Sequence, residues 1–249
     1  MTTPADTTLL LSAVRNNAVW CDAVCRSHGR PGTFEPHAWV SHTPTPPFYP
    51  NVVTLSDAEG ADGQRATVAA LATSGLARPW AVKDSFAALD LTPLGLRPLF
   101  DATWIGRPAG MPLPSDVASD DEWRTVRDAA LLTAWEAAWS GEAESPEEPV
   151  FRPALLADPE VAVLAGVRDG RVIAGVVANR SEGVTGISNL FVPEDVPALR
   201  AAALAAVAAA FPGTGLVGYE HGDDLAAMLA LGFTALGPLR VWELAIAAP

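Results

Sequence analysis

The chain has 249 residues, of which 49% are hydrophobic and 18% charged, a composition typical of a globular protein with one large core or two small ones. Its 29 acidic residues against 16 lysines and arginines give a formal net charge of −13. A surface with that charge repels nucleic-acid phosphates and anionic lipids, so neither nucleic acid nor a membrane is an expected partner.

No segment predicts a membrane helix or a secretion signal. The longest apolar run, 201–211, falls well short of the roughly 20 residues that a membrane span needs, and residues 1–8 are polar, unlike a leader. The only cysteines, Cys21 and Cys25, lie four positions apart, where a disulfide would close almost no loop. We therefore expect a cytoplasmic protein with free thiols.

The first half of the chain predicts helices alternating with short strands. Residues 8–28 predict a long helix that ends at Gly29 and Pro31, because glycine and proline terminate helices. The next predicted elements are strands over 33–42 and 48–55, a helix over 64–74, a strand over 80–82, a short helix over 85–91 and a strand over 100–105. Residues 106–116 are rich in glycine and proline and predict a linker.

The second half predicts three antiparallel strands followed by alternating helices and strands. Ser119 and Asp120 predict the cap of a long helix over 121–139. Asp169-Gly170 is a strong hairpin signal between two of the strands. The remaining predicted elements are a helical turn over 150–156, strands over 161–167, 171–178 and 185–192, a helix over 197–210, a strand over 215–219, a helix over 223–231 and a strand over 239–246.

Two short sequences in this half carry a resemblance. Residues 187–192, ISNLFV, resemble the fourth strand of the GCN5-related N-acetyltransferase (GNAT) superfamily, and residues 231–233, LGF, resemble the end of its last helix. The order of the predicted elements is similar as well, and residues 218–244 are similar to the ends of actinobacterial GNAT-like proteins. In the first half, residues 46–55 and 91–105 look like parts of a degenerate copy.

The resemblance implies an α/β (α+β) fold built of two tandem GNAT-like modules. Each module is expected to be a mixed, mostly antiparallel sheet flanked by helices. The expected modules cover 1–108 and 116–249, with a linker over 109–115.

The resemblance also implies transfer of an acetyl or other acyl group from acyl-CoA to a small amine, but the family's phosphate-binding motif is missing. That motif, Arg/Gln-x-x-Gly-x-Gly/Ala, places bare amides at a helix N-terminus against the coenzyme's diphosphate. Residues 193–200 at that position read PEDVPALR, with two acids and no glycine. A carboxylate about 5 Å from a phosphate costs roughly 3 kcal/mol at an effective dielectric of about 20, so the expected coenzyme site is atypical.

Coenzyme and catalytic residues follow from the same resemblance. Phe191 and Val192 end the fourth strand, where the family polarises the thioester carbonyl with a backbone amide. With Arg200 they are the expected acyl-CoA-binding residues. The family's usual catalytic tyrosine is replaced by Met228, which leaves Tyr219 on the preceding strand as the candidate proton donor.

Substrate-binding candidates come from both halves. Ser188 and Asn189 are polar residues within an apolar strand, and such side chains need partners; in the family this strand borders the acceptor pocket. In the first half, His37 and Trp39 share a face of one predicted strand and Tyr49 lies on its neighbour. These three predict a small-molecule pocket with His37 as a catalytic candidate, although the same pattern fits ordinary half-buried side chains.

The remaining polar candidates indicate less. Cys21, Cys25 and His28 supply too few zinc ligands at an untypical spacing, so no metal is expected. Cys25 and His28 are close enough along a helix to form a nucleophilic pair. Lys83 and Asp84 read as isolated, solvated charges.

Three functions therefore remain open for a monomer or homodimer that binds a small molecule. The first is an acyl-CoA-dependent N-acyltransferase. The second is an inactive GNAT-fold protein that binds or regulates. The third is an enzyme of other chemistry in the cleft between the modules, with His37, Tyr49 or Cys25 as participants.

Overall fold

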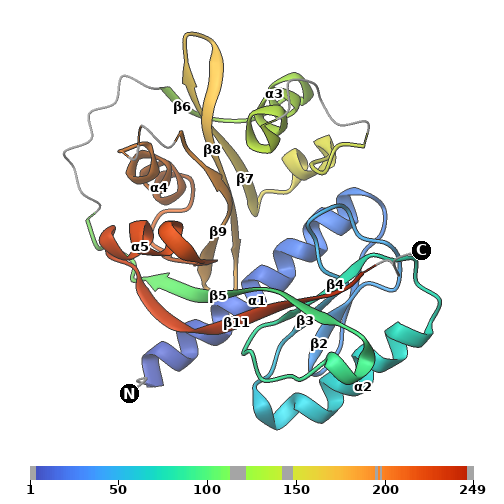
Figure 1. The fold of residues 1–249 in the computed structure, drawn as a ribbon. Helices are drawn as coiled ribbons and strands as arrows, with labels where there is room; N and C mark the ends of the chain where they lie inside the picture. The colour runs from blue at the N-terminus through green and yellow to red at the C-terminus, as the bar shows by residue number, and fades with distance from the viewer. Residues whose placement is uncertain (1–3, 113–121, 142–147, 194–195, 197, 246–249) are drawn as a thin grey trace.

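A computed structural model describes residues 4–112, 122–141, 148–193, 196 and 198–245. Within them, one open sheet of 11 strands runs through the molecule in the order β1-β2-β3-β4-β11-β5-β10-β9-β8-β7-β6 (Figure 1). Two neighbouring pairs, β3 with β4 and β9 with β10, are parallel, and the other pairs are antiparallel. A mixed and mostly antiparallel α/β sheet is the predicted fold class, which is confirmed.

The elements agree in order with most of the predicted ones. The strands are β1 (Thr33–Phe34), β2 (Ala38–Val40), β3 (Val52–Thr54), β4 (Trp80–Asp84), β5 (Arg97–Arg107), β6 (Glu122–Thr125), β7 (Val161–Arg168), β8 (Arg171–Ser181), β9 (Val184–Phe191), β10 (Gly215–Glu220) and β11 (Thr234–Leu244). The helices are α1 (Pro4–Ser27), α2 (Ala61–Thr73), α3 (Ala129–Ser140), α4 (Ala198–Ala210) and α5 (Gly222–Ala230).

Strands from the two halves of the chain interleave at the centre of the sheet. The last strand, β11, lies between β4 and β5, and β5 pairs on its other side with β10. The predicted linker therefore follows β5, a strand of the first half that lies between two strands of the second half, β11 and β10. The division at 108 and 116 stays a prediction, and residues 113–115 of the linker lie outside the described residues.

The predicted short helix over 85–91 is wrong. Those residues form turns, because the buried carboxylate of Asp84 accepts hydrogen bonds from the amides of Ala88 (3.2 Å) and Leu89 (2.9 Å). Ala87 has a φ of 50°, which a helix does not allow. A side chain thus takes the amides that a helix would have used.

The predicted long helix over 121–139 is wrong in its first part. Residues 122–125 form the edge strand β6, which pairs with β7 and lays Trp123 over Gly166. The helix begins after Asp128, whose carboxylate accepts the N–H of Leu131 at 2.9 Å. The predicted cap at Ser119 and Asp120 lies outside the described residues.

Helices cover both faces of the sheet. Alternate residues of β10 illustrate the layers: Val217 packs in the cluster with α1 and α3, whereas Leu216 packs in the cluster with α4 and α5. Because side chains alternate along a strand, Tyr219 points to the α1 side and Glu220 to the α4 side. Helix α1 lies against β5, β8, β9, β10 and β11.

A pair of asparagines fixes α1 on the sheet. Asn16 donates from Nδ2 to the carbonyl of Asn179 (3.0 Å), and Asn179 donates from Nδ2 to the carbonyl of Asn16 (3.2 Å). The helix comes so close to β9 that a Cβ on Gly186 would lie 2.0 Å from Asn16 Oδ1. This contact fixes the position of α1 on the sheet, and with it the positions of Asn17 and Cys21 on the same helix.

Candidate active site

The two parallel strands β9 and β10 diverge after a short contact. They pair from Gly215 opposite Val184 to Val217 opposite Gly186 and no further. A bulge bends β9 here: between its pairs with β8 it advances from Ser188 to Phe191, while β8 moves only two residues. Asn189 in the bulge has a φ of 53°, a left-handed conformation that asparagine tolerates better than most residues. The bulge therefore opens a gap beside β10.

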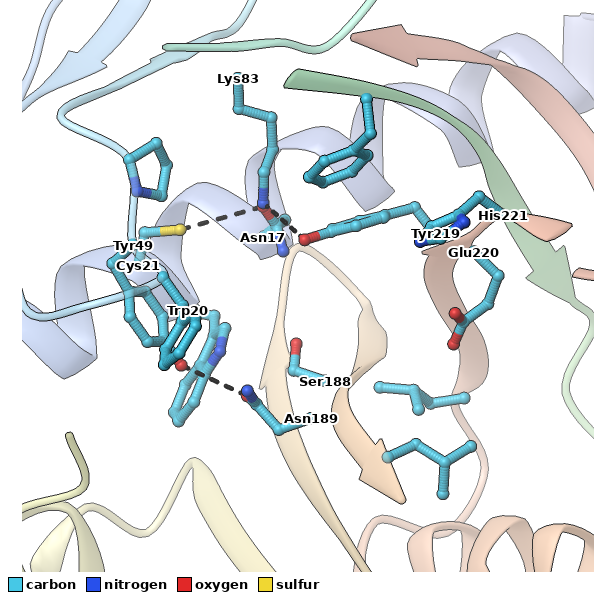
Figure 2. A pocket seen from close by; sticks show the side chains of 15 residues that line it. Asn17, Trp20, Cys21, Tyr49, Lys83, Ser188, Asn189, Tyr219, Glu220 and His221 are labelled. Carbon is cyan, nitrogen blue, oxygen red and sulfur yellow. Dashed lines mark hydrogen bonds between the residues drawn. The ribbon is translucent and has the colours of Figure 1, made fainter. Parts of the chain in front are cut away.

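A cavity of about 230 Å³ lies at this gap (Figure 2). Its lining comes from elements far apart in the sequence: α1, the segment before β3, β4, β5, β9 and β10. The polar residues that line it are Asn17, Cys21, Tyr49, Lys83, Ser188, Asn189, Tyr219, Glu220 and His221.

Lys83 and Tyr219 meet at one side of the cavity. Lys83, only 5% exposed, donates from Nζ to Asn17 Oδ1 (2.7 Å) and to the hydroxyl of Tyr219 (3.2 Å). Figure 2 shows these two side chains directed at one another. Burial lowers the pKa of Lys83, but the neighbouring Tyr219 and Cys21 outweigh it when they ionise, so that the net pKa is raised. A buried ammonium group is thus held against a phenol oxygen.

Tyr49 and Cys21 lie in the same cavity as neutral groups. The Tyr49 hydroxyl donates to Asn189 Oδ1 at 3.3 Å, and burial raises the pKa of Tyr49 well above its usual range. Burial also raises the pKa of Cys21, although Lys83 lowers it in part. Neither group therefore acts as an anion near neutral pH.

Glu220 is the acid of the cavity. Burial, and then the nearby Asp224, raise the pKa of Glu220 to about 7, while Arg200 opposes the rise. Its carboxylate is directed away from Lys83 in Figure 2, as expected from the alternation along β10. A carboxylate that titrates near neutral pH is suited to accept a proton from an amine.

Of the residues predicted to bind substrate or catalyse, four lie together. Tyr49, Ser188, Asn189 and Tyr219 all line the cavity. His37 is exposed, and its Nδ1 lies 3.2 Å from Ser56 Oγ.

Trp39 is fully buried, and its Nε1 donates to Asp22 at 3.0 Å. Neither His37 nor Trp39 is part of this lining. The period of two predicted both residues on one strand, but only Trp39 lies in β2, and His37 lies just before it.

None of the three predicted coenzyme-binding residues is among those that line the cavity. Phe191 and Val192 are half-buried at the end of β9, and the Phe191 ring packs edge-on against Trp135 with centroids 5.3 Å apart. Arg200 donates from a guanidinium nitrogen to Asp224 Oδ1 at 2.6 Å.

The turn that should bind phosphates offers few free amides in its described part. The Val196 amide donates to the Pro193 carbonyl (3.1 Å), and the Leu199 amide donates to the Val196 carbonyl (3.0 Å). Glu194, Asp195 and Pro197 lie outside the described residues.

The residues of the cavity that sequence reasoning missed include Asn17, Lys83 and Glu220. The interpretation of Lys83 and Asp84 as solvated is wrong, since they are 5% and 0% exposed. The sequence did contain a signal, because Lys83 follows the apolar residues 80–82 in a predicted strand. A charged residue at such a position lies either on an edge strand or in a functional site.

Cys25 and His28 each have surroundings unlike those of a nucleophilic pair. Cys25 is fully buried, and burial raises the pKa of its thiol to about 12, so it is a poor nucleophile. His28 Nε2 lies 2.9 Å from the Val150 carbonyl, and Nδ1 lies 3.5 Å from Arg152 Nε. Over the described ranges, no group of three or more His, Cys, Asp or Glu residues is placed to hold a metal. None of the described helices combines the length and the apolar character that crossing a bilayer requires.

Comparison with known proteins gives matches in structure but not in sequence. No protein-family model matches the chain, and no curated protein does either. A GCN5-related N-acetyltransferase from Kribbella flavida superposes with a TM-score of 0.62 at 16% identity, over 93% of this chain and 95% of its own.

A second structure, described as an acetyltransferase of the GNAT family from Novosphingobium aromaticivorans, gives a TM-score of 0.56 at 15% identity. It covers 94% of this chain and 99% of its own. A Staphylococcus epidermidis protein of unknown function gives 0.52 at 8% identity, over 85% and 92%. The similarity spans both halves of the chain, which therefore has the fold of the GCN5-related N-acetyltransferases.

Proposed function

We propose that the chain is an N-acyltransferase that moves an acyl group from acyl-CoA to the amine of a small molecule. The observation that carries this proposal is the pair of proton-transfer groups at one gap. Glu220, with a pKa of about 7, and the Tyr219 hydroxyl, 3.2 Å from a buried ammonium group, both line the cavity between β9 and β10.

The residues at the gap fit the acyl end of the coenzyme better than its phosphate end. Ile187, Ser188 and Leu190 line the cavity and offer an apolar surface with one hydroxyl, which suits an uncharged acyl chain. At the phosphate end, the Val196 and Leu199 amides are already bonded and Arg200 is paired with Asp224. Binding would therefore rest mainly on the acyl end. When bound, acyl-CoA supplies an acyl group activated as a thioester.

Glu220 would act as the general base. Amines are protonated near neutral pH, and an attacking amine must lose a proton. A Glu220 carboxylate with a pKa of about 7 is ionised in a large fraction of molecules at that pH and still basic enough to accept the proton at Oε.

Tyr219 would supply the proton for the departing sulfur. Lys83 Nζ donates to its hydroxyl oxygen at 3.2 Å and so holds the phenol in place beside the gap. Asn17 accepts a second Lys83 hydrogen bond at 2.7 Å and so orients the ammonium group. In this role Lys83 and Asn17 are positioning residues.

Calorimetric titration with acetyl-CoA, followed by mass spectrometry of amines incubated with it, tests the proposal. We expect binding at millimolar concentrations or below and acetylated product. Tyr219→Phe should reduce kcat about 10- to 100-fold and leave coenzyme binding intact. The absence of heat at millimolar acetyl-CoA would remove the proposal.

A specific observation favours a second candidate, a GNAT-fold protein that binds a small molecule without acyl transfer. The amides and the arginine that would grip a diphosphate have partners within the chain. Under this candidate, native mass spectrometry of the purified protein should show a retained metabolite, and acetyl-CoA should not displace it.

A further inference from the structure

A larger cavity continues outward from the site. It has a volume of about 780 Å³ and shares Tyr49, Lys83, Asn189 and Tyr219 with the smaller one. Its outer part is built from the proline-rich segment 44–50, the segment before β4 and the start of β5. A small molecule seated in it would reach Lys83 and Tyr219, which line both cavities.

Two cations of this cavity have no carboxylate partner within the part of the chain that the structure describes. Arg30 and Arg78 both line it and are exposed. Arg30 donates to the Pro44 carbonyl at 3.3 Å, and among the described residues neither arginine forms an ion pair. Such cations are unusual in a chain with a net charge of −13.

The acids of the same cavity are already neutralised. Glu243 is bound by Arg97 at 2.9 Å, and Glu148 by Arg152 at 3.5 Å. Neither of these arginines lines the cavity. The unmatched charge at the outer part is therefore positive, which favours an anionic group on the ligand.

Apolar side chains also line the outer part, and one of them is a strained aromatic. Phe48 is 82% exposed and Leu99 52% exposed, and both line the cavity. Phe48 has a φ of 70°, a left-handed conformation that is strained for a bulky residue. Its ring is held edge-on to Trp139, with centroids 5.4 Å apart. An exposed aromatic ring held in place at a cavity is typical of a surface that contacts a ligand.

We propose that the acceptor of the larger cavity is a small molecule with an anionic group at one end, an apolar body and a primary amine at the other end. The anionic group, a carboxylate in the simplest case, binds at Arg30 and Arg78. The body lies against Phe48 and Leu99, and the amine reaches the cavity shared with Tyr219. This inference rests on the proposed function for its acceptor role, whereas anion binding at the arginines does not depend on it.

Three matched probes test the inference without any coenzyme. They are 4-(aminomethyl)benzoate, which has both ends, 4-methylbenzylamine, which lacks the carboxylate, and 4-methylbenzoate, which lacks the amine. By calorimetry we expect both carboxylates to bind about tenfold more tightly than 4-methylbenzylamine. Arg30→Gln and Arg78→Gln should each reduce that ratio several-fold.

Control variants separate the site from general effects. Arg127→Gln removes an exposed arginine outside both cavities and should leave the ratio unchanged. Phe48→Ala should weaken all three probes together. The inference is overturned if 4-methylbenzylamine binds as tightly as the carboxylates, if no probe binds at millimolar concentration, or if both arginine variants keep the wild-type ratio. Carboxylate binding that depends on the arginines, without acetylation of 4-(aminomethyl)benzoate, would support the anion site and count against the acyltransferase.

Discussion

The sheet contains two parallel strand pairs, β3 with β4 and β9 with β10, and they end differently. After Val53 and Lys83, the first pair is closed: the Ser85 amide donates to Thr54 Oγ1 at 2.8 Å, and Asp84 takes two amides of the next turn. After Val217 and Gly186 the second pair opens into the cavity. The two strand pairs therefore differ in the polar side chains that follow their last paired residues. In the closed pair, backbone amides of the same chain donate hydrogen bonds to those side chains.

Both pairs contribute to one site. Lys83 comes from β4 of the closed pair and Tyr219 from β10 of the open one, and they meet at 3.2 Å. We propose that the two pairs are corresponding parts of two tandem modules over 1–108 and 116–249, since each joins two parallel strands through a helix, α2 or α4. In that case the closed module provides an ammonium group to a gap in the other.

The largest expected effect concerns the open pair. Glu220→Gln should lower kcat about 100- to 10,000-fold, because the proton acceptor is lost, with little change in the affinity for acetyl-CoA. Steady-state kinetics with a productive amine measures it. Asp223→Asn, an exposed acid three positions on, is the matched control and should retain wild-type kcat. Equal losses in both variants would remove Glu220 from the mechanism.

The closed pair should respond in stability instead. Asp84→Ala leaves the Ala88 and Leu89 amides without their acceptor and should lower the free energy of unfolding by about 2–3 kcal/mol. Urea denaturation monitored by tryptophan fluorescence measures this change. Asp84→Asn keeps one acceptor oxygen and should lose less. A stability unchanged in Asp84→Ala would show that the closed end does not depend on this carboxylate.

Lys83 tests the comparison further, because it lies on β4 of the closed pair and contacts Tyr219 on β10 of the open pair. Lys83→Met keeps the length of the side chain and removes its charge. It should lower kcat about 10- to 100-fold, since the phenol oxygen loses its stabilising ammonium group, whereas stability should change by no more than about 1 kcal/mol because a buried charge is replaced by an apolar group. A wild-type kcat in this variant would show that Tyr219 acts without help from Lys83.

The order of elements could be predicted from the sequence, but the meeting of the two halves could not. Local signals such as Asp169-Gly170, with φ values of 50° and 75°, gave the hairpin of β7 and β8 directly. Tyr219, Asn189 and Tyr49 followed from a resemblance and from polar residues in apolar strands. Lys83 was missed because its partner Tyr219 lies 136 positions away, and no local pattern encodes the insertion of β11 between β4 and β5.

The smallest expected effect is a pH dependence of stability that only the open pair should show. The pKa of Glu220 is raised from 4.5 to about 7 in the folded chain, so between these values the folded state binds a proton that the unfolded state has lost. Stability should therefore fall as the pH rises from about 5 to 8. The contribution is about 1–2 kcal/mol once partial solvent screening is allowed for.

Unfolding in urea at pH 5 and pH 8, in the wild type and in Glu220→Gln, isolates this contribution. The variant should lack the Glu220 part of the slope and should be the more stable protein at pH 8, even though it is the less active. If the two proteins lose the same free energy between these pH values, the carboxylate is not buried enough to be a base near neutral pH. Glu220 would then lose its assigned role, while the anion site at Arg30 and Arg78 would be unaffected.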